Sequence, residues 1–357
     1  MARDYQYIIK VEFASKNKNT LLLDELVSYP FSKSYKDHFQ ISNKSIKIVA
    51  SRSSKIELNS IFYNYNSALN KQIKKAISYY YCGLGEANKI RTIKVARFIN
   101  NVLQDEKVFT LKNIKQIIGI NSNLLILTQL DKNELKTLLE ETVKGHAIFI
   151  SVTHLIRACS FDNPFDQFDR LWKSFNALFK EITQKRRDAD CLIDLKNHMN
   201  NNPYLYPLST AEISPLNVAQ IREKIRWNSM LLNDFPTDSK ALELKGFIER
   251  MTDSRLISIM KSSLPLREVH LKSKGYYQAV TLHINNHTST PVTSNIDLLG
   301  VLCLRYMYFV RNKTFHAEKL DSSFNLIPNN KEEQELAWCS NILKILVIDL
   351  INFNSKY

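Results

Sequence analysis

The sequence contains little glycine and proline, few cysteines and no long apolar run. Its 357 residues include only 7 Gly and 9 Pro, which leaves little room for flexible linkers and favours helices. The five cysteines are scattered and form no Cys-x-x-Cys pair, so we expect neither a zinc ribbon nor a disulfide framework. The longest apolar stretch, 342–353, is broken by Lys344, Asp349 and Asn352, and it is too short to predict a membrane span.

No apolar segment follows the first five residues, so the sequence predicts no secretory signal. Hydrophobic residues make up 44% of the chain and charged residues 24%. This balance is typical of a soluble globular protein with a sizeable core. Together with the unpaired cysteines, it leads us to expect a cytoplasmic protein that does not associate with a membrane.

Basic residues are in excess, and the excess is uneven. The formal net charge is +14. Residues 1–150 hold 23 basic and 13 acidic side chains, whereas residues 151–357 hold 26 and 22. Because a basic surface attracts polyanions by releasing their counterions, this charge points to a nucleic acid as partner.

The first 145 residues predict a basic α+β module. Residues 5–13, 45–50 and 53–58 are rich in β-branched and aromatic side chains and read as strands. From residue 66 the apolar residues recur at helical spacing. Further helices are predicted over 86–102, 111–118 and 133–144.

A basic segment within this module is a candidate RNA-binding surface. Residues 71–115 contain ten Lys or Arg against three acidic residues. Lys74 and Lys75, followed by the tyrosines at 79–81, combine charge with aromatic rings, as surfaces that bind single strands do. The alternative is a solvated helix face without a ligand.

Residues 146–357 predict a second, wholly helical domain, so the fold class is mainly α. Asp162 or Asn163, followed by Pro164, predicts the start of a helix with an apolar stripe over 165–182. Residues 263–293 are expected to be irregular. Ser294, with Asp297 three residues later, predicts the cap of an apolar helix that reaches residue 310, and a final helix is predicted from residue 331.

Three residues near the end of this apolar helix are candidate catalytic residues. Arg311 is followed by Asn312, and His316 lies five residues after the arginine. Histidine moves protons near neutral pH, and the arginine guanidinium is a permanent cation that fits a phosphate. Asn312 precedes His316 by one helical turn and is placed to orient the imidazole or a phosphate oxygen. A structural alternative is a helix-terminal histidine with Arg311 paired to Glu318.

These residues resemble the motif of the HEPN superfamily. Its ribonuclease members carry an Arg, then a polar residue, and a His after four to six residues. The string 308–317 matches that pattern, except that many relatives have Gly where this chain has Ala317. The string 168–179 resembles the first helix of abortive-infection and Apea-like members. The resemblance covers about residues 150–355 and implies a helical bundle.

The resemblance also implies a function. Its ribonuclease members cleave RNA without a metal or cofactor, by attack of the 2′-hydroxyl, and many act in prokaryotic antiviral or toxin-type defence. The resemblance implies a composite site in a homodimer. The geometry is consistent with it, because on a straight helix Arg311 and His316 point about 140° apart and a two-fold axis could bring two of each together. Additional RNA contacts are expected at Lys313, Arg186 and Arg187, although a solvated face explains the arginine pair equally well. A protein or nucleotide activator, or an antitoxin, is a further expected partner.

Other classes of function remain open from the sequence. A HEPN-like scaffold that only binds a nucleotide or a protein is one alternative, and a basic DNA-binding protein is another. No metal site is expected, because Asn285-Asn286 predict a loop between His283 and His287 and no carboxylate or cysteine flanks them.

Overall fold

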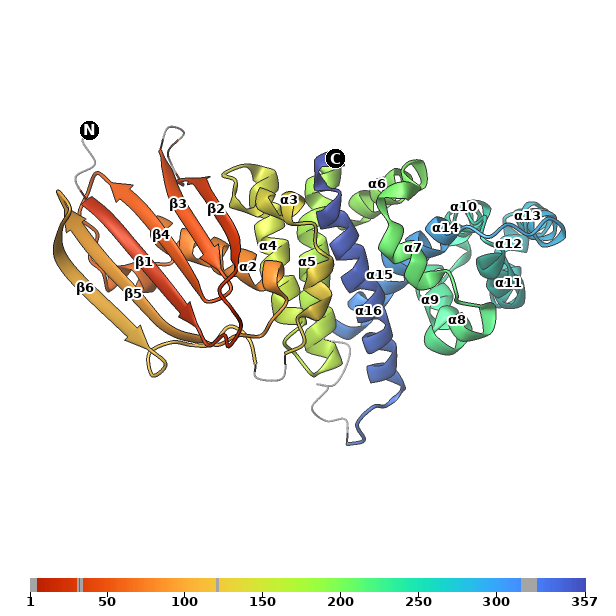
Figure 1. Cartoon of the computed structure of the whole chain (residues 1–357). Helices are drawn as coiled ribbons and strands as arrows, with labels where there is room; N and C mark the ends of the chain where they lie inside the picture. The colour runs from red at the N-terminus through yellow and green to blue at the C-terminus, as the bar shows by residue number, and fades with distance from the viewer. Residues whose placement is uncertain (1–4, 31, 33–34, 120–121, 316–325) are drawn as a thin grey trace. The chain divides into compact units, whose positions relative to one another are not determined.

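The computed structural model describes all residues except 1–4, 31, 33–34, 120–121 and 316–325 (Figure 1). The chain forms two compact units, one made of residues 1–181 with 351–357 and the other of residues 182–350. The domain boundary that the sequence suggests after residue 145 falls inside helix α4 (Val143–Ala158).

The first unit is built on an antiparallel six-stranded sheet with the order β2-β3-β4-β1-β5-β6. The predicted strands over 5–13 and 45–50 are confirmed, and four more strands join them. The segment 53–58, predicted as a strand, lies beyond the end of β4. The strands are β1 (Tyr5–Phe13), β2 (Leu21–Ser28), β3 (Lys36–Ser42), β4 (Ser45–Arg52), β5 (Ile90–Ile99) and β6 (Val102–Thr110).

Helix α2 (Ala68–Leu84) covers one face of this sheet (Figure 1). Alternate residues of β1 face it, so Tyr7, Ile9 and Val11 are fully buried. The ring of Phe13 stacks on that of Tyr80, with 3.7 Å between their centroids. All three tyrosines at 79–81 are at most 1% exposed, and burial raises the pKa of Tyr79 to about 12. They belong to the core, so the expected aromatic surface beside Lys74 and Lys75 is wrong.

The predicted basic helix over 86–102 is also wrong, because this segment forms strand β5 and the turn to β6. Asn100 and Asn101 connect the strands with φ angles of 49° and 63°. Two consecutive residues with positive φ make the type of tight turn whose twist matches a hairpin, and asparagine tolerates this conformation better than most residues. The Asn-Asn pair between two β-rich runs was therefore the signal for a hairpin.

Most of the other described residues of the first unit are helical. The predicted helix over 165–182 is confirmed, and Asn163 Oδ1 accepts a hydrogen bond from the backbone N–H of Phe165 at its start, at 2.8 Å. Residues 111–118, predicted as a helix, contain none. The final residues of the chain return to this unit, where Asn352 Oδ1 accepts from the N–H of Asp131 at 2.7 Å. The helices besides α2 and α4 are α1 (Ser60–Tyr63), α3 (Lys132–Leu135) and α5 (Pro164–Thr183).

The described residues of the second unit are helical apart from connecting turns, so an α+β N-terminal part and a helical C-terminal part are confirmed. Residues 263–293 were expected to be irregular, but they contain two helices. The helices described in the second unit are α6 (Asp188–Asn201), α7 (Pro207–Ile213), α8 (Val218–Lys224), α9 (Trp227–Asp234), α10 (Ala241–Glu249), α11 (Ser254–Ser263), α12 (Glu268–Ser273), α13 (Tyr277–Ser289), α14 (Asn295–Gly300), α15 (Met307–Phe315) and α16 (Lys331–Asn352).

A π-helix (Val301–Tyr306) links α14 to α15. Such wide turns occur within helices mostly where they serve a function. Within the described part of the chain, no helix is both long and apolar enough to cross a membrane.

Candidate active site

The candidate active site lies at the end of the helical run α14, π-helix and α15. As predicted, Ser294 caps this run: its Oγ accepts from the N–H of Asp297 at 3.3 Å. The run is apolar and buried through Val310, which is 0% exposed. From Arg311 to Thr314 the side chains are half-buried. The polar motif therefore begins where a core helix reaches the surface.

Arg311 and Asn312 are joined by a hydrogen bond. The guanidinium Nη1 of Arg311 donates to Oδ1 of Asn312 at 3.0 Å. A planar guanidinium is a permanent cation whose shape fits a phosphate. His316 lies outside the described residues, as does Glu318. The expected contacts of Asn312 with His316 and of Arg311 with Glu318 stay predictions.

A buried polar cluster holds the end of the π-helix against the start of α16. The hydroxyl of Tyr306 donates to a carboxylate oxygen of Glu335, which is 5% exposed. The same hydroxyl accepts from the backbone N–H of Arg226 at 2.7 Å. Arg226 Nε lies 2.8 Å from Glu335 Oε2. This cluster fixes the turn of the helical run that directly precedes the motif.

Burial shapes the protonation of this cluster. Burial, together with the neighbouring Glu335 carboxylate, raises the pKa of Tyr306 far above its usual value, so the phenol stays protonated and donates. For Arg226, burial opposes the charged form, but the Glu335 carboxylate outweighs it and the pKa of the guanidinium is raised. The carboxylate of Glu335 is thus bound on two sides by groups that keep their protons.

A cavity of about 500 Å³ opens beside this cluster. The guanidinium carbon of Arg226, which lines it, lies 5.8 Å from the ring centroid of Phe309, two residues before Arg311. The sequence alone offered no signal for this cavity, because its walls come from α8 and α16. Its charged lining consists of four basic residues, Arg222, Lys224, Arg226 and Lys331, and three acidic ones, Glu223, Glu332 and Glu335.

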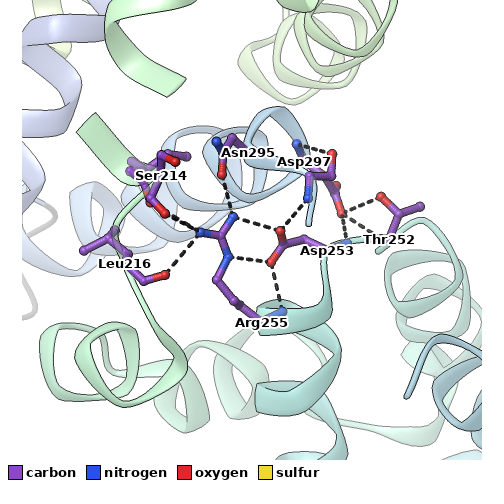
Figure 2. Close-up of polar contacts among 9 residues, drawn as sticks. Ser214, Leu216, Thr252, Asp253, Arg255, Asn295 and Asp297 are labelled. Carbon is purple, nitrogen blue, oxygen red and sulfur yellow. Dashed lines mark hydrogen bonds and ion pairs between the residues drawn. The ribbon is translucent and has the colours of Figure 1, made fainter. Parts of the chain in front are cut away.

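A second polar network holds the other end of the helical run in place (Figure 2). Arg255 and Asp253 are 8% and 0% exposed. The guanidinium of Arg255 donates to Asp253 through Nε at 3.0 Å and Nη2 at 2.9 Å, and to Asn295 Oδ1 at 2.8 Å. Asp253 Oδ2 also accepts from the N–H of Ser294 at 2.8 Å. The first residues of α14 are therefore hydrogen-bonded to the start of α11.

Asp297 extends this network (Figure 2). Its Oδ2 accepts from the backbone N–H groups of Thr252 and Asp253 at 2.7 and 3.1 Å. Its Oδ1 lies 3.1 Å from the ammonium of Lys196. Since Asp297 is only 3% exposed, these partners replace the water that its charge would otherwise bind.

The remaining predicted RNA contacts lie in three places. Lys313 is half-buried on α15, next to the motif. Arg186 and Arg187 are exposed immediately before α6 in the same unit. Lys74 is exposed on α2 of the first unit, whereas its neighbour Lys75 is 1% exposed.

Lys75 is a structural residue. Its ammonium donates to the carbonyl oxygens of Leu139 and Glu140 at 2.8 and 2.9 Å, and to Glu141 Oε1 at 2.6 Å. Burial lowers the pKa of Lys75, although the Glu141 carboxylate acts in the opposite direction. All three donors are used inside the protein, so the expectation that Lys75 contacts RNA is wrong.

His283 and His287 lie on helix α13, so the expected loop between them is wrong. Their ring centroids are 4.2 Å apart. His287 Nδ1 is 3.0 Å from the carbonyl oxygen of His283, and His283 Nε2 is 3.0 Å from that of Met251. Among the described residues, no group of three or more His, Cys, Asp or Glu side chains is arranged to hold a metal ion.

No protein-family model, no curated protein and no solved structure matches this chain. The residues of the site and the motif that they form are therefore what point to a function.

Proposed function

We propose that this protein is a metal-independent endoribonuclease of the HEPN type. The observation that carries the proposal is the position of Arg311 and Asn312, hydrogen-bonded to each other at 3.0 Å where a buried helix reaches solvent. The cluster around Tyr306 and the network around Asp253 support it, because they fix the start of the helical run and the turn before Arg311. Preorganised donors of this kind stabilise charge that develops in a transition state.

In the proposed reaction, the 2′-hydroxyl of a ribose loses its proton and its oxygen attacks the adjacent phosphorus. The bond from phosphorus to the 5′-oxygen breaks, and that oxygen receives a proton. The products are a 2′,3′-cyclic phosphate and a 5′-hydroxyl end. His316 moves protons, and Arg311 neutralises the charge that builds up on the phosphate oxygens. Asn312 holds the guanidinium in its orientation.

We also propose that two copies of the chain form the complete site. A two-fold axis near the end of α15 would bring two Arg311 and two His316 side chains to one phosphate. Lys313 would add positive charge at the same place. The resemblance to abortive-infection proteins supports a role of this activity in antiviral or toxin-type defence.

The test is cleavage of an end-labelled single-stranded RNA in excess EDTA. The full-length chain is compared with His316→Ala and with Arg311→Ala. Exposed residues far from the motif in the sequence provide matched controls. They are His146→Ala on α4 and Arg91→Ala on β5. We expect both site variants to lose at least about a hundredfold in rate, with cyclic phosphate ends from the parent and both controls.

Sedimentation of the parent protein tests the composite site. A dimer of the 41.5 kDa chain is expected under the conditions of cleavage. Equal cleavage by the parent and His316→Ala would refute the proposed site, and so would cleavage that EDTA abolishes. Absence of cleavage by the parent on RNA of several sequences would favour a binding scaffold instead.

A further inference from the structure

A cavity of about 560 Å³ lies in the first unit, lined by residues of α2 and of the hairpin of β5 and β6. Lys107 and Phe109 of β6 pair with Val95 and Ile93 of β5. Cross-strand partners share a face of the sheet, and Val95 and Ile93 are 0% and 7% exposed on the face that α2 covers. Both β6 side chains therefore point to the side of α2. The apolar lining consists of Ile73, Ile77, Ile90, Ile93, Ile114 and Ile117.

The charged lining of the cavity is entirely basic. Lys74 of α2, Lys107 of β6 and Lys115 of the following segment all line it and are exposed to solvent. None of the three forms an ion pair within the described residues. Among the described residues that line the cavity, none is acidic. Three unpaired ammonium groups around one hollow repel one another, and an anion bound between them would relieve that repulsion.

A buried amide faces the same cavity. Asn70 of α2 is 7% exposed and belongs to the lining. Its side-chain amide has no hydrogen-bond partner in the described part of the chain. Its amide atoms are not among the fully buried polar atoms without a partner, so solvent in the cavity reaches them and a ligand could replace that solvent. Asn70 can both donate and accept, which is what recognition of the polar edge of a planar base requires.

Aromatic rings complete the lining. Phe62 and Phe109 meet edge to face, with 4.9 Å between their centroids. Tyr63 is 84% exposed and also lines the cavity. Aromatic side chains with a free face stack on nucleobases whatever the base. The cavity thus combines apolar walls, ring faces, one unpaired amide and three cations.

We propose that this cavity binds a nucleotide, with the base against Phe62 and Phe109 and the phosphate between Lys74, Lys107 and Lys115. Its volume is in the range of small-molecule sites. The unpaired Asn70 amide and the aromatic lining favour a nucleotide over a fatty acid, whose chain would leave the amide without a partner. The nucleotide is either free or the terminal residue of a strand. This site lies in the first unit and is independent of the proposed cleavage.

Calorimetric titration of the full chain tests the site. The probes are the four nucleoside 5′-monophosphates, adenosine, inorganic phosphate, lauric acid and a 5′-phosphorylated 2′-O-methyl RNA tetramer, which the proposed reaction cannot cleave. We expect at least one monophosphate to bind at least about tenfold more tightly than adenosine or phosphate. Tighter binding of the tetramer assigns the site to strand ends, and tighter binding of the monophosphate assigns it to free nucleotides.

The variant Lys74→Gln/Lys107→Gln/Lys115→Gln should weaken monophosphate binding by about tenfold or more. The matched control is Lys112→Gln, an exposed lysine of the same segment that does not line the cavity. The triple variant should melt no lower than the parent, because no ion pair is lost. Unchanged affinity in that variant would overturn the proposal, and so would binding of lauric acid but of no monophosphate. Because binding is measured without cleavage, either proposal can fail alone.

Discussion

Arg255 binds Asp253 through two parallel hydrogen bonds of 3.0 and 2.9 Å, although the two residues are only two positions apart and both are over nine-tenths buried. The pair lies at the first turn of α11. From there it also holds Asn295 and the backbone of Ser294 at the start of α14. A local ion pair thus connects two helices that are some forty residues apart.

Removing one partner of this pair should destabilise the protein strongly. Asp253→Ala leaves a buried guanidinium and the N–H of Ser294 without their acceptor, and we expect a loss of about 3–5 kcal/mol in the free energy of unfolding. Urea unfolding measures it. The control is Glu243→Ala, which breaks the exposed pair with Lys240 and should change stability by less than about 1 kcal/mol. Equal effects would show that the buried pair is not an organising contact.

The same substitution at two neighbouring lysines should change the free energy of unfolding by very different amounts. Lys75→Ala removes three hydrogen bonds, among them the buried bond to the carbonyl oxygen of Leu139, so we expect a loss of at least about 2–3 kcal/mol. Lys74→Ala removes an exposed side chain and should stay within about 0.5 kcal/mol. Thermal or urea unfolding of the two variants compares them directly. A mild effect of Lys75→Ala would contradict its structural role.

The carboxylate of Glu141 should contribute to stability in a pH-dependent way. Partial burial alone would raise its pKa, but hydrogen bonds from Lys71 and Lys75 outweigh burial and lower it. A group whose folded pKa is lowered stabilises the fold above its unfolded pKa, about 4.3, and loses that contribution as the pH falls through the folded pKa.

The stability difference between the parent and Glu141→Gln should therefore be present at pH 7 and shrink on acidification below about pH 4. Unfolding at several pH values measures it. Because Glu141 is partly exposed, we expect less than about 1 kcal/mol at pH 7. A difference that grows on acidification would have the wrong sign for this ion pair.

Substitutions of Asn101 in the turn between β5 and β6 should distinguish a hairpin from a helix by their effect on stability. Asn101 has a φ of 63°, which costs a β-branched residue about 1–2 kcal/mol. We expect Asn101→Val to destabilise by that amount and Asn101→Gly to be neutral or slightly stabilising. In a helix the order would be reversed, because glycine is a poorer helix former than valine. Urea unfolding of both variants decides the order.

Strong local patterns in the sequence predicted several elements correctly. The Asn163-Pro164 entry predicted α5, Ser294 predicted the cap of α14, and the acidic start at residue 331 predicted α16. Each depends on a side chain that binds its own helix end or on a long apolar stripe. Such signals need no distant partner, so they can be read locally.

Short amphipathic segments were harder to assign. Residues 86–102 carry apolar and basic residues at spacings that fit a helix or a strand, and the pairing of β5 with β1 decided for the strand. Strand pairing joins residues far apart in the sequence, which no local window contains. The motif Arg311-Asn312 was visible in the sequence, but the cavity beside Arg226 was not, because α8 and α16 are about a hundred residues apart.

The sequence by itself determined the predominance of helices, the basic charge of the first 150 residues and the position of the Arg311 motif at the end of an apolar helix. Only the tertiary structure decided what each charged residue does. It buried Lys75 against carbonyl oxygens, left Lys74 on the rim of a cavity and joined it there with Lys107 and Lys115. The physical reason is that a charge is stabilised or left free by the groups that folding brings around it, and those groups come from distant parts of the chain.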